Sequence, residues 1–405
     1  MLKSILPDEA RDILLGLAAA PITERVPIGD AAGRVLAEDV TATVPIPPFD
    51  RSPFDGYAFR GEDTANASRE TPVTLKITEE IPAGHVPTVE ITHGFAAKIL
   101  TGSPLPVGAN VTVKYEYTEF TDTEVTIFQP IPPNKDVIYA GSDVAVGEVV
   151  ARRGDVLHPP LLGLLASEGI AEVAVFKAPR AAIINTGTEL CEPGQPLPPA
   201  KIYNSSVFTL SGYLREVGVQ AWNAGVVRDE PAEIAARIKD ALAVSDVVIT
   251  TGGASVGDYD CALRAAELLG AETLFWKTKL KPGGAVVASV LGGKLILALS
   301  GNPGAAVIFL LRVALPYMKK LCGRTDCLPE TIEVLLKEPF TKESTRVRLL
   351  RGRLEISGGT AYFVERGGQG GGDIGSLKGC DLLAELPAGS PKLPAGTLVR
   401  AYVVN

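Results

Sequence analysis

Apolar and polar residues follow two different patterns in the first half of the chain. Residues 6–20 carry charged and apolar positions at helical spacing up to Pro21, which predicts one short amphipathic helix. From about residue 44 to residue 140 the pattern changes to β-branched runs separated by proline and glycine, which is typical of a small β domain. The clearest of these runs span residues 73–77, 111–117 and 124–128. The pattern of residues 142–175, with an apolar helix predicted at 161–166, indicates that the chain returns to the unit formed by its first segment.

Strand-like and helical patterns alternate between residues 179 and 323. The predicted strands span 181–185, 220–227 and 246–250, and the predicted helices span 207–217, 231–243, 259–269 and 304–318. This alternation predicts a mainly parallel sheet covered by helices, with ligands bound where strands end and helices begin. Beyond residue 328 the pattern returns to short strands and glycine turns without a long helix, which predicts a terminal β domain.

The expected fold class is therefore a multidomain α/β plus β protein. A central doubly wound α/β domain would be joined by a small β domain inserted near the N-terminus and by a C-terminal β domain. The predicted domains are residues 1–44 together with 142–178, then 45–141, 179–325 and 326–405. The chain has 405 residues, of which 46% are hydrophobic, enough for a sizeable core in each domain.

Charge and cysteine content exclude several classes of function. A formal net charge of -8 gives no general attraction for nucleic acid or for an anionic membrane, so local cations must bind any anionic ligand. Five scattered cysteines lack the spacing of a disulfide framework or a zinc site, and we expect them to be reduced in a cytoplasmic protein. With only three histidines, a histidine-bound metal centre or a Ser-His-Asp triad is poorly supported.

No segment has the pattern of a signal peptide or a membrane span. The N-terminal residues are interrupted by charges, whereas a signal peptide needs an unbroken apolar region. The longest uncharged apolar stretch, 295–311, is interrupted by the sequence SGNPG at 300–304, which would leave backbone groups unsatisfied in lipid. We expect a buried strand, a loop and a buried helix there.

Two glycine-containing turns predict an anion site in the α/β domain. The sequence SDVVITTGGASVGDYD at 245–260 places a Thr-Gly-Gly turn between an apolar strand and a helix, where small residues let backbone amides approach a phosphate. The alternative is a tight turn without a ligand, which is frequent for a single such motif. A second turn, LSGNPGA at 299–305, has Pro303 suited to the first turn of a helix. Together the two turns favour the binding of two ends of one ligand.

Three lysines lie between these turns. Lys277, Lys279 and Lys281 alternate in a strand-like sequence, so the period of two predicts one cationic face. The alternative is an exposed edge strand protected by charge.

Carboxylates and hydroxyls follow other predicted strands. Asn185 begins NTGTELCEPG, which contains Thr186, Thr188 and Glu189. In the β region, the sequence DRSPFDGYA at 50–58 contains Asp55, and Thr101 begins a hydroxyl-rich loop. Paired carboxylates there could bind Mg²⁺ together with water and phosphate. They could equally form Asx-turns, and for a single Asp-Gly the turn is the more frequent case.

The order and spacing of these motifs resemble the molybdopterin molybdotransferase family. Its hallmarks are DxSxMDGYA, TGxPxPxGAD, NTGDEL, TxGGxSxGDYD, FWKxxxKPG and LPGNP, and the match spans nearly the whole chain. The resemblance implies an L-shaped homodimer of four-domain subunits with a barrel-like C-terminal domain. It also implies a cleft between the α/β domain of one subunit and the β domains of the other.

The resemblance further implies insertion of molybdate into adenylyl-molybdopterin, with release of AMP and help from a divalent metal such as Mg²⁺. The implied catalytic residues are Asp55, Thr101, Glu189, Asp260, Lys277 and Lys281. The implied metal ligands are Asp55, Glu189 and Asp258. The residues expected to bind the pterin substrate are Thr251, Gly252, Gly253, Ser255, Gly257, Asp258, Gly301, Asn302 and Pro303. Other cofactor-assembly proteins and acceptor enzymes are the implied partners.

The sequence departs from the family pattern at five positions. These are Phe54 in place of methionine, Asn110 and Ser142 in place of acids, Gly284 where lysine usually follows KPG, and Ser300 in place of proline. A tungstate-inserting paralogue and a non-catalytic molybdopterin-binding scaffold therefore stay open as alternatives. A nicotinamide-dependent oxidoreductase is disfavoured, because no GxGxxG turn follows the first α/β strand.

Overall fold

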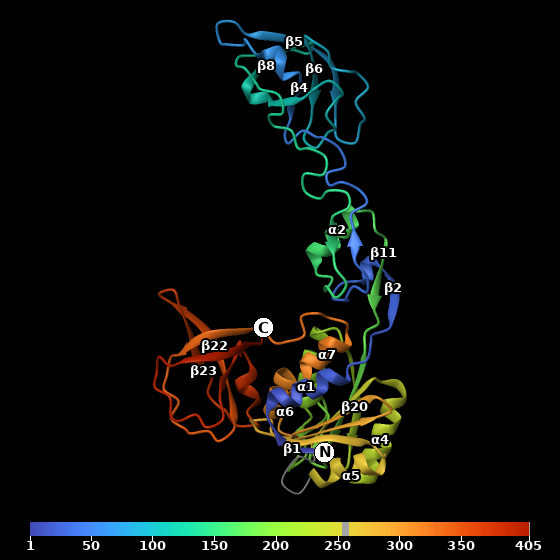
Figure 1. Cartoon of the computed structure of the whole chain (residues 1–405), viewed down its shortest axis with the longest axis vertical. Coiled ribbons are helices and arrows are strands. Elements are labelled where there is room, and N and C mark those ends of the chain that lie inside the picture. Colours follow the sequence, from blue (N-terminus) through green and yellow to red (C-terminus); the bar gives the residue numbers. More distant parts are fainter. Residues whose placement is uncertain (253–258, 405) are drawn as a thin grey trace.

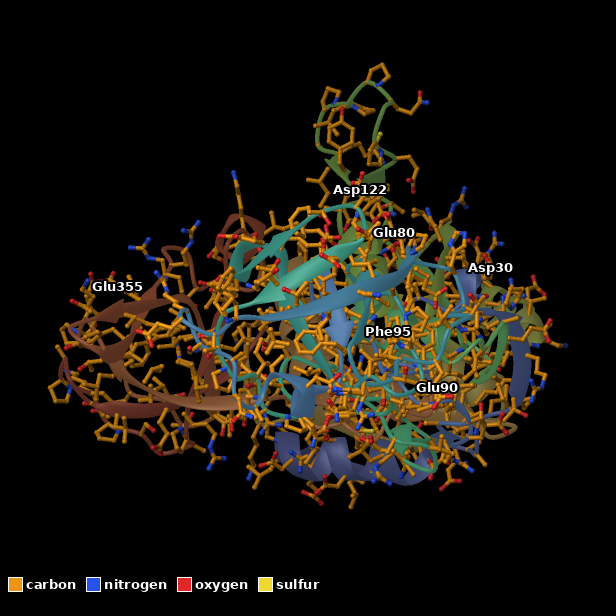
Figure 2. The ribbon with its side chains drawn as sticks, turned by 90° about the horizontal axis from the view of Figure 1, so that it is seen from above. Asp30, Glu80, Glu90, Phe95, Asp122 and Glu355 are labelled. Atoms are coloured by element: carbon orange, nitrogen blue, oxygen red, sulfur yellow. The ribbon has the colours of Figure 1, made fainter. Side chains whose placement is uncertain are left out.

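The computed structural model describes residues 1–252 and 259–404, without the side chains of residues 259 and 260. The chain is L-shaped (Figure 1). An N-terminal β unit stands at one end, a slender linker unit follows, an α/β unit forms the corner, and a C-terminal barrel lies beside it. Seen from above, the β unit with Glu80, Phe95 and Asp122 projects over the α/β unit, while the barrel with Glu355 lies to one side (Figure 2).

A seven-stranded sheet with the order β1-β17-β19-β20-β16-β12-β15 forms the centre of the α/β unit. Its strands are β1 (Leu2–Ile5), β12 (Arg180–Thr186), β15 (Gln220–Val227), β16 (Val247–Thr251), β17 (Glu272–Thr278), β19 (Val286–Leu291) and β20 (Lys294–Leu299). Only β19 runs antiparallel to its neighbours. Strands β12, β16 and β20 are buried along nearly their whole length, as expected of strands with helices on both faces. The predicted mainly parallel sheet is confirmed.

Helices cover both faces of this sheet. One face carries α1 (Pro7–Leu17), α3 (Ser206–Glu216), α6 (Pro303–Phe309), the π-helical turn η4 (Leu310–Ala314) and α7 (Leu315–Leu321), and the other carries α4 (Pro231–Val244) and α5 (Tyr259–Leu268). Alternate residues of β12 point to opposite cores, because Ile183 packs with the first group and Ile184 with the second. The doubly wound arrangement is therefore confirmed. The amphipathic helix predicted at residues 6–20 is α1, and it packs with β1 on the α/β unit.

The linker unit is made of two segments far apart in the sequence. Strand β2 (Thr23–Pro27) pairs with β11 (Glu172–Phe176), and β3 (Val40–Thr41) pairs with β10 (Val149–Ala151), while α2 (Pro159–Ser167) covers them. The return of the chain to its first segment, predicted for residues 142–175, is confirmed by these pairings.

The N-terminal β unit is a six-stranded sheet with the order β7-β4-β6-β5-β9-β8. Its strands are β4 (Gly56–Phe59), β5 (Val73–Ile81), β6 (Phe95–Ile99), β7 (Val111–Lys114), β8 (Thr118–Phe120) and β9 (Glu124–Ile127). A separate core that includes Tyr57, Leu75 and Val125 holds it together. The linker unit separates this β unit from the α/β unit of the same chain (Figure 1).

The C-terminal unit is a closed five-stranded barrel. Its strands are β21 (Thr331–Leu336), β22 (Val347–Ser357), β23 (Thr360–Glu365), β24 (Leu382–Leu386) and β25 (Leu398–Val403). The barrel closes because the long strand β22 pairs with both β23 and β24. A short strand from the α/β unit, β18 (Leu280–Lys281), adds to β22 in parallel. The barrel implied by the family resemblance is confirmed.

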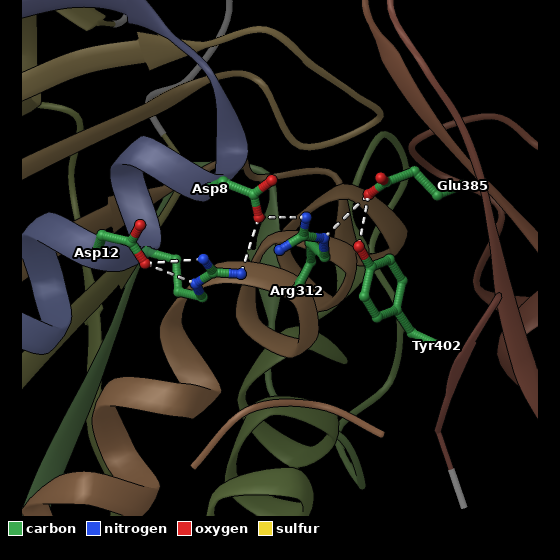
Figure 3. Close-up of polar contacts among 6 residues, drawn as sticks. Asp8, Asp12, Arg312, Glu385 and Tyr402 are labelled. Atoms are coloured by element: carbon green, nitrogen blue, oxygen red, sulfur yellow. Dashed lines mark hydrogen bonds and ion pairs between the residues drawn. The ribbon is translucent and has the colours of Figure 1, made fainter. Parts of the chain in front are cut away.

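A buried arginine fastens the barrel to the α/β unit (Figure 3). Arg312 of η4 is 2% exposed, and it donates hydrogen bonds to Asp8 Oδ1 of α1 (2.6 Å) and to Glu385 Oε2 of β24 (3.2 Å). Tyr402 donates to the same Glu385 oxygen (2.9 Å), and its ring lies 4.5 Å from the guanidinium. Arg11 adds a second cation on Asp8. These contacts define the relative position of the two units.

Two further expectations can be compared with the structure. Cys191, Cys322, Cys327 and Cys380 are thiols that form no disulfide. In the described part of the chain, no helix combines the length and apolar character needed to cross a membrane.

Candidate functional site

The two predicted glycine turns meet at the carboxyl edge of the large sheet. They follow the neighbouring parallel strands β16 and β20. Gly252 has φ +102°, and a Cβ there would lie 2.0 Å from the carbonyl oxygen of Thr186. A Cβ on Gly301 would lie 2.9 Å from Gly252 Cα. Only glycine fits at this contact, because a side chain would overlap the neighbouring backbone. The contact holds both turns at the carboxyl edge of the sheet, where ligands bind in such folds.

Buried polar side chains form hydrogen bonds that stabilise the first turn. Asn185 Nδ2 donates to Thr251 Oγ1, and Asn204 Nδ2 donates to Asn185 Oδ1 at 3.1 Å. Both asparagines and Thr251 are almost fully buried. The remaining predicted residues of this turn, Gly253, Ser255, Gly257 and Asp258, lie outside the described residues, as does the side chain of Asp260.

The second turn opens α6 with Asn302 as the N-cap and Pro303 in the first turn, as its sequence predicts. The backbone N–H of Ala305 donates to Asn302 O and to Gly371 O, each at 3.0 Å. A glycine-rich loop of the barrel, residues 370–373, therefore covers part of this helix start. No local pattern near residue 302 indicates this contact with residue 371, because the two residues are far apart in the sequence.

The prediction that three lysines share one strand face is wrong. Strand β17 ends at Thr278, and Lys277 has the left-handed φ of +64°. The Lys279 amide bonds to Ile5 O of β1, whereas Lys281 belongs to β18 and pairs with the barrel. The chain changes sheets within these residues, so a period of two does not apply across them. Lys277 instead lies with its Nζ 4.6 Å from the Trp276 ring.

A cleft of about 540 Å³ separates the α/β unit from the barrel. Lys281, Ser300 and Asn302 line its α/β side, and residues 343–346 together with Arg348 line its barrel side. Lys281 and Asn302, two residues of the predicted site, thus line the same cleft. The contribution of the barrel was missed, and only the basic sequence around residues 346–348 could have indicated it.

The departure at Gly284 has a backbone cause. A Cβ at this position would lie 2.5 Å from Leu280 O and 2.7 Å from Thr278 O. The Gly284 carbonyl accepts a hydrogen bond from the Thr278 amide at 2.9 Å, which fixes this tight approach. Since backbone atoms cannot give way as a flexible side chain can, no lysine fits at residue 284 in this conformation.

Glu189 lies at the end of the loop that follows β12. It is exposed, and its carboxylate lies over Gly187, where a Cβ would be 2.6 Å from Glu189 Oε2. The short strands β13 (Leu190–Cys191) and β14 (Ile202–Tyr203) pair next to it, and Lys201 Nζ donates to the Thr188 carbonyl. This parallel strand pair holds Glu189 on the α/β unit.

A second cluster lies on the N-terminal β unit. Asp55 Oδ1 accepts hydrogen bonds from the backbone N and the Oγ1 of Thr101, both at 2.7 Å. These two bonds, first from the side chain and then from the backbone, lower the pKa of the exposed Asp55 carboxyl. The Asp55 carboxylate thus bonds to a residue 46 positions away, whereas the alternative from the sequence was a local Asx-turn. The structure therefore brings together Asp55 and Thr101, which were predicted from separate motifs.

Asn110, another departure from the family pattern, has a structural role. Its Oδ1 accepts from the Gly61 amide at 2.8 Å, and its Nδ2 donates to Glu62 at 3.0 and 3.1 Å. An aspartate at this position would face the Glu62 carboxylate with a second negative charge, so the amide suits this contact.

The two clusters belong to different units, which the linker unit separates (Figure 1). Asp55 and Thr101 are on the β unit, while Glu189, Thr251, Gly301 and Lys281 are on or beside the α/β unit. Within residues 1–252 and 259–404, no group of three or more His, Cys, Asp and Glu side chains is arranged to hold a metal ion.

Three family models match the chain in the order of these units. The MoeA N-terminal region (domain I and II) matches residues 5–169, a probable molybdopterin binding domain matches residues 182–320, and the MoeA C-terminal region (domain IV) matches residues 333–404. Fold and site together thus define a protein of the molybdopterin-binding class.

Curated relatives and solved structures identify the family. The chain is 32% identical over 374 residues to the molybdopterin molybdenumtransferase of Staphylococcus aureus strain MSSA476, covering 92% of this chain and 89% of that protein. It is 31% identical over 378 residues to that of Staphylococcus epidermidis, covering 93% of this chain and 90% of that protein. The molybdopterin biosynthesis MoeA protein of Pyrococcus horikoshii is 30% identical, with a TM-score of 0.82 over 99% of both chains. The chain belongs to the molybdopterin molybdenumtransferase family, and the resemblance found in its motifs is confirmed.

Proposed function

We propose that this protein inserts molybdate into adenylyl-molybdopterin and releases AMP. The contact between the Gly252 and Gly301 turns, beside a cleft lined by Lys281, carries this proposal. It places small residues and a helix start where a phosphorylated pterin can approach the backbone. The family relationship makes the chain a transferase, and the polar residues of both clusters supply groups that such a transfer needs.

In the proposed reaction, water attacks phosphorus and breaks the phosphoanhydride bond between AMP and the pterin phosphate, while the two pterin sulfurs replace molybdate oxygens that leave as water. Negative charge develops on the departing phosphate. Lys281 would stabilise that charge at the cleft, together with Lys277 at the adjoining end of β17. Thr251, Gly252, Gly301, Asn302 and Pro303 would hold the pterin phosphate. Gly253, Ser255, Gly257 and Asp258 would extend this cradle, and Asp260 and Glu189 would add acidic groups at the same edge.

A divalent metal such as Mg²⁺ fits the Asp55 cluster in one respect. Thr101 occupies Asp55 Oδ1, whereas no hydrogen bond within the described part of the chain reaches Oδ2. Mg²⁺ commonly uses one or two carboxylates and completes its shell with water and substrate phosphate. When bound, the ion would neutralise charge on the adenylyl phosphate. Glu189 and Asp258 are the further proposed ligands, and Asp55 and Thr101 would hold the ion in place.

We further propose that the active enzyme is a homodimer. The Asp55 cluster and the Lys281 cleft cannot meet within one L-shaped chain, because the linker unit holds them apart (Figure 1). A second copy could bring its β unit to the cleft, so that each site would use residues from two subunits. We place the enzyme in the cytoplasm, with other cofactor-assembly proteins and acceptor enzymes as its partners.

The decisive experiment is turnover of adenylyl-molybdopterin by the purified dimer. AMP release that depends on added molybdate and Mg²⁺ is the expected result. Release with tungstate but not with molybdate would identify a tungstate-inserting paralogue. Tight pterin binding without AMP release under either oxyanion would identify a binding scaffold and overturn the enzymatic proposal.

A further inference from the structure

Lys281 and Arg348 are register partners on adjacent strands. Strand β18 of the α/β unit and strand β22 of the barrel run in parallel, with Leu280 opposite Val347 and Lys281 opposite Arg348. Paired residues on neighbouring strands direct their side chains to the same face of the sheet. Both residues line the cleft between the two units. The barrel therefore places a second cation directly beside the lysine of the proposed substrate site.

Two like charges at paired positions destabilise a sheet unless an opposite charge compensates them. Among the described residues, no carboxylate forms an ion pair within 4.0 Å of either cation. Glu343 also lines the cleft without such a pair. Glu365 interacts with Arg348 through its charge but forms no ion pair within 4.0 Å. Neither cation is therefore neutralised by direct contact with a carboxylate of the described residues, and both can bind an anion from outside the chain.

The side chain of Arg348 packs against the ring of Phe340, which holds it in place. Its guanidinium lies 5.3 Å from the Phe340 ring, and its Nε is buried without a hydrogen-bond partner. An arginine stacked on an aromatic ring loses little freedom when it binds an oxyanion, and its planar fork suits phosphate oxygens. These features are those of an anion-binding arginine with its aromatic support already formed.

The glycine at residue 284 shows why this cation matters. Gly284 lines the same cleft, and the backbone leaves no room for a charged side chain at that position. We propose that Arg348 supplies the positive charge that residue 284 cannot, so that Lys281 and Arg348 together bind the phosphate groups of the substrate. This inference rests on the proposed function for the identity of the substrate. The pair itself recognises any compact oligophosphate.

The test compares Arg348→Gln with a matched control on the same strand. Arg353 lies on β22 outside the cleft, beside Glu355, so Arg353→Gln removes the same charge away from the site. Calorimetric titration with inorganic pyrophosphate and with adenylyl-molybdopterin at low salt gives the affinities. We expect Arg348→Gln to weaken both by about tenfold or more, as loss of a charge-assisted hydrogen bond does. We expect Arg348→Lys to recover part of the loss, and Arg353→Gln to bind like the wild type.

Thermal unfolding distinguishes this role from a structural one. Removing one of two adjacent like charges offsets the lost ring contact, so Arg348→Gln should unfold within about 2 °C of the wild type. Equal affinity of Arg348→Gln and wild type would overturn the inference while AMP release by the wild type upheld the proposed function. Pyrophosphate binding that depends on Arg348, without any AMP release by the wild type, would uphold the inference and overturn the proposed function. Absence of binding of both ligands to the wild type would overturn both.

Discussion

Asp55 and Thr101 form a two-bond contact across loops that are separate in the sequence. One oxygen of the Asp55 carboxylate accepts both the amide and the hydroxyl of Thr101, each at 2.7 Å. A carboxylate held by two donors has a fixed direction and stays ionised more readily. Neither residue makes this contact to complete a core, since both are exposed. The arrangement favours a role in chemistry over a role in folding.

Asp55→Asn should therefore slow turnover without unfolding the protein. A carboxylate that holds a metal or charge at the adenylyl phosphate acts mostly in the transition state, so we expect AMP release to fall by about a hundredfold with little loss of substrate affinity. The rate of AMP release, measured at saturating metal and molybdate in reactions stopped at fixed times, would test this expectation. Asp122→Asn removes an exposed acid from the same unit (Figure 2) and should be neutral. Wild-type rates in Asp55→Asn would remove this residue from the mechanism.

The pH dependence of turnover should reveal the Thr101 contact. The Thr101 hydroxyl and amide lower the Asp55 pKa in the folded protein, so the ionised form persists to lower pH than in a free aspartate. Thr101→Val removes the hydroxyl bond and should raise that pKa, which moves the acidic limb of kcat/KM to higher pH. Thr126→Val removes a hydroxyl bond to Thr74 in the same unit and should leave the limb in place. An acidic limb unchanged in Thr101→Val would contradict the assignment.

A shared active site makes a prediction about mixed dimers. Light scattering at micromolar concentration should report about twice the 42.5 kDa chain mass. Asp55→Asn and Lys281→Gln should each be nearly inactive alone. Refolding the two together should restore about a quarter of wild-type activity, because half of the dimers would be mixed and each would have one intact site. A monomer in solution, or no recovery on mixing, would argue that the site lies within one chain.

The Arg312 contacts predict a stability change that depends on pH. Removing one partner of a fully buried ion pair costs roughly 3–5 kcal/mol. Because Asp8 is 60% exposed, we expect about 2 kcal/mol for Arg312→Met in chemical denaturation at pH 7. Arg11 forms ion pairs with the exposed acids Asp8 and Asp12, so Arg11→Met should cost less than about 0.5 kcal/mol.

The sign of the pH effect follows from Asp8. Burial raises its pKa, but the hydrogen bond and charge of Arg312 outweigh this, so the folded pKa lies below 3.8. A lowered pKa contributes stability that is present above the unfolded value and is lost as the pH falls through the folded value. The difference between wild type and Arg312→Met should therefore shrink under acid conditions. A difference that grew as the pH fell would contradict this account.

Local sequence determined most of the elements and the chemistry expected of them. Apolar periodicity gave the strands β12, β16 and β15 and the helices between them, since a helix and a buried strand each follow from residues close in sequence. Glycine turns at residues 252 and 301 likewise predicted a binding edge, because parallel strands end at a common edge of the sheet. The motif order alone was specific enough to indicate the family.

Tertiary structure decided which of these groups meet. The three lysines share no face, because Lys281 pairs with Arg348 of a strand far along the chain. The α6 start is covered by the carbonyl of Gly371, and Asp55 binds Thr101 instead of its own turn. Pairing between distant strands depends on the packing of whole units, which no local pattern records. The sequence thus determined which residues can act here, while long-range packing determined which of them act together.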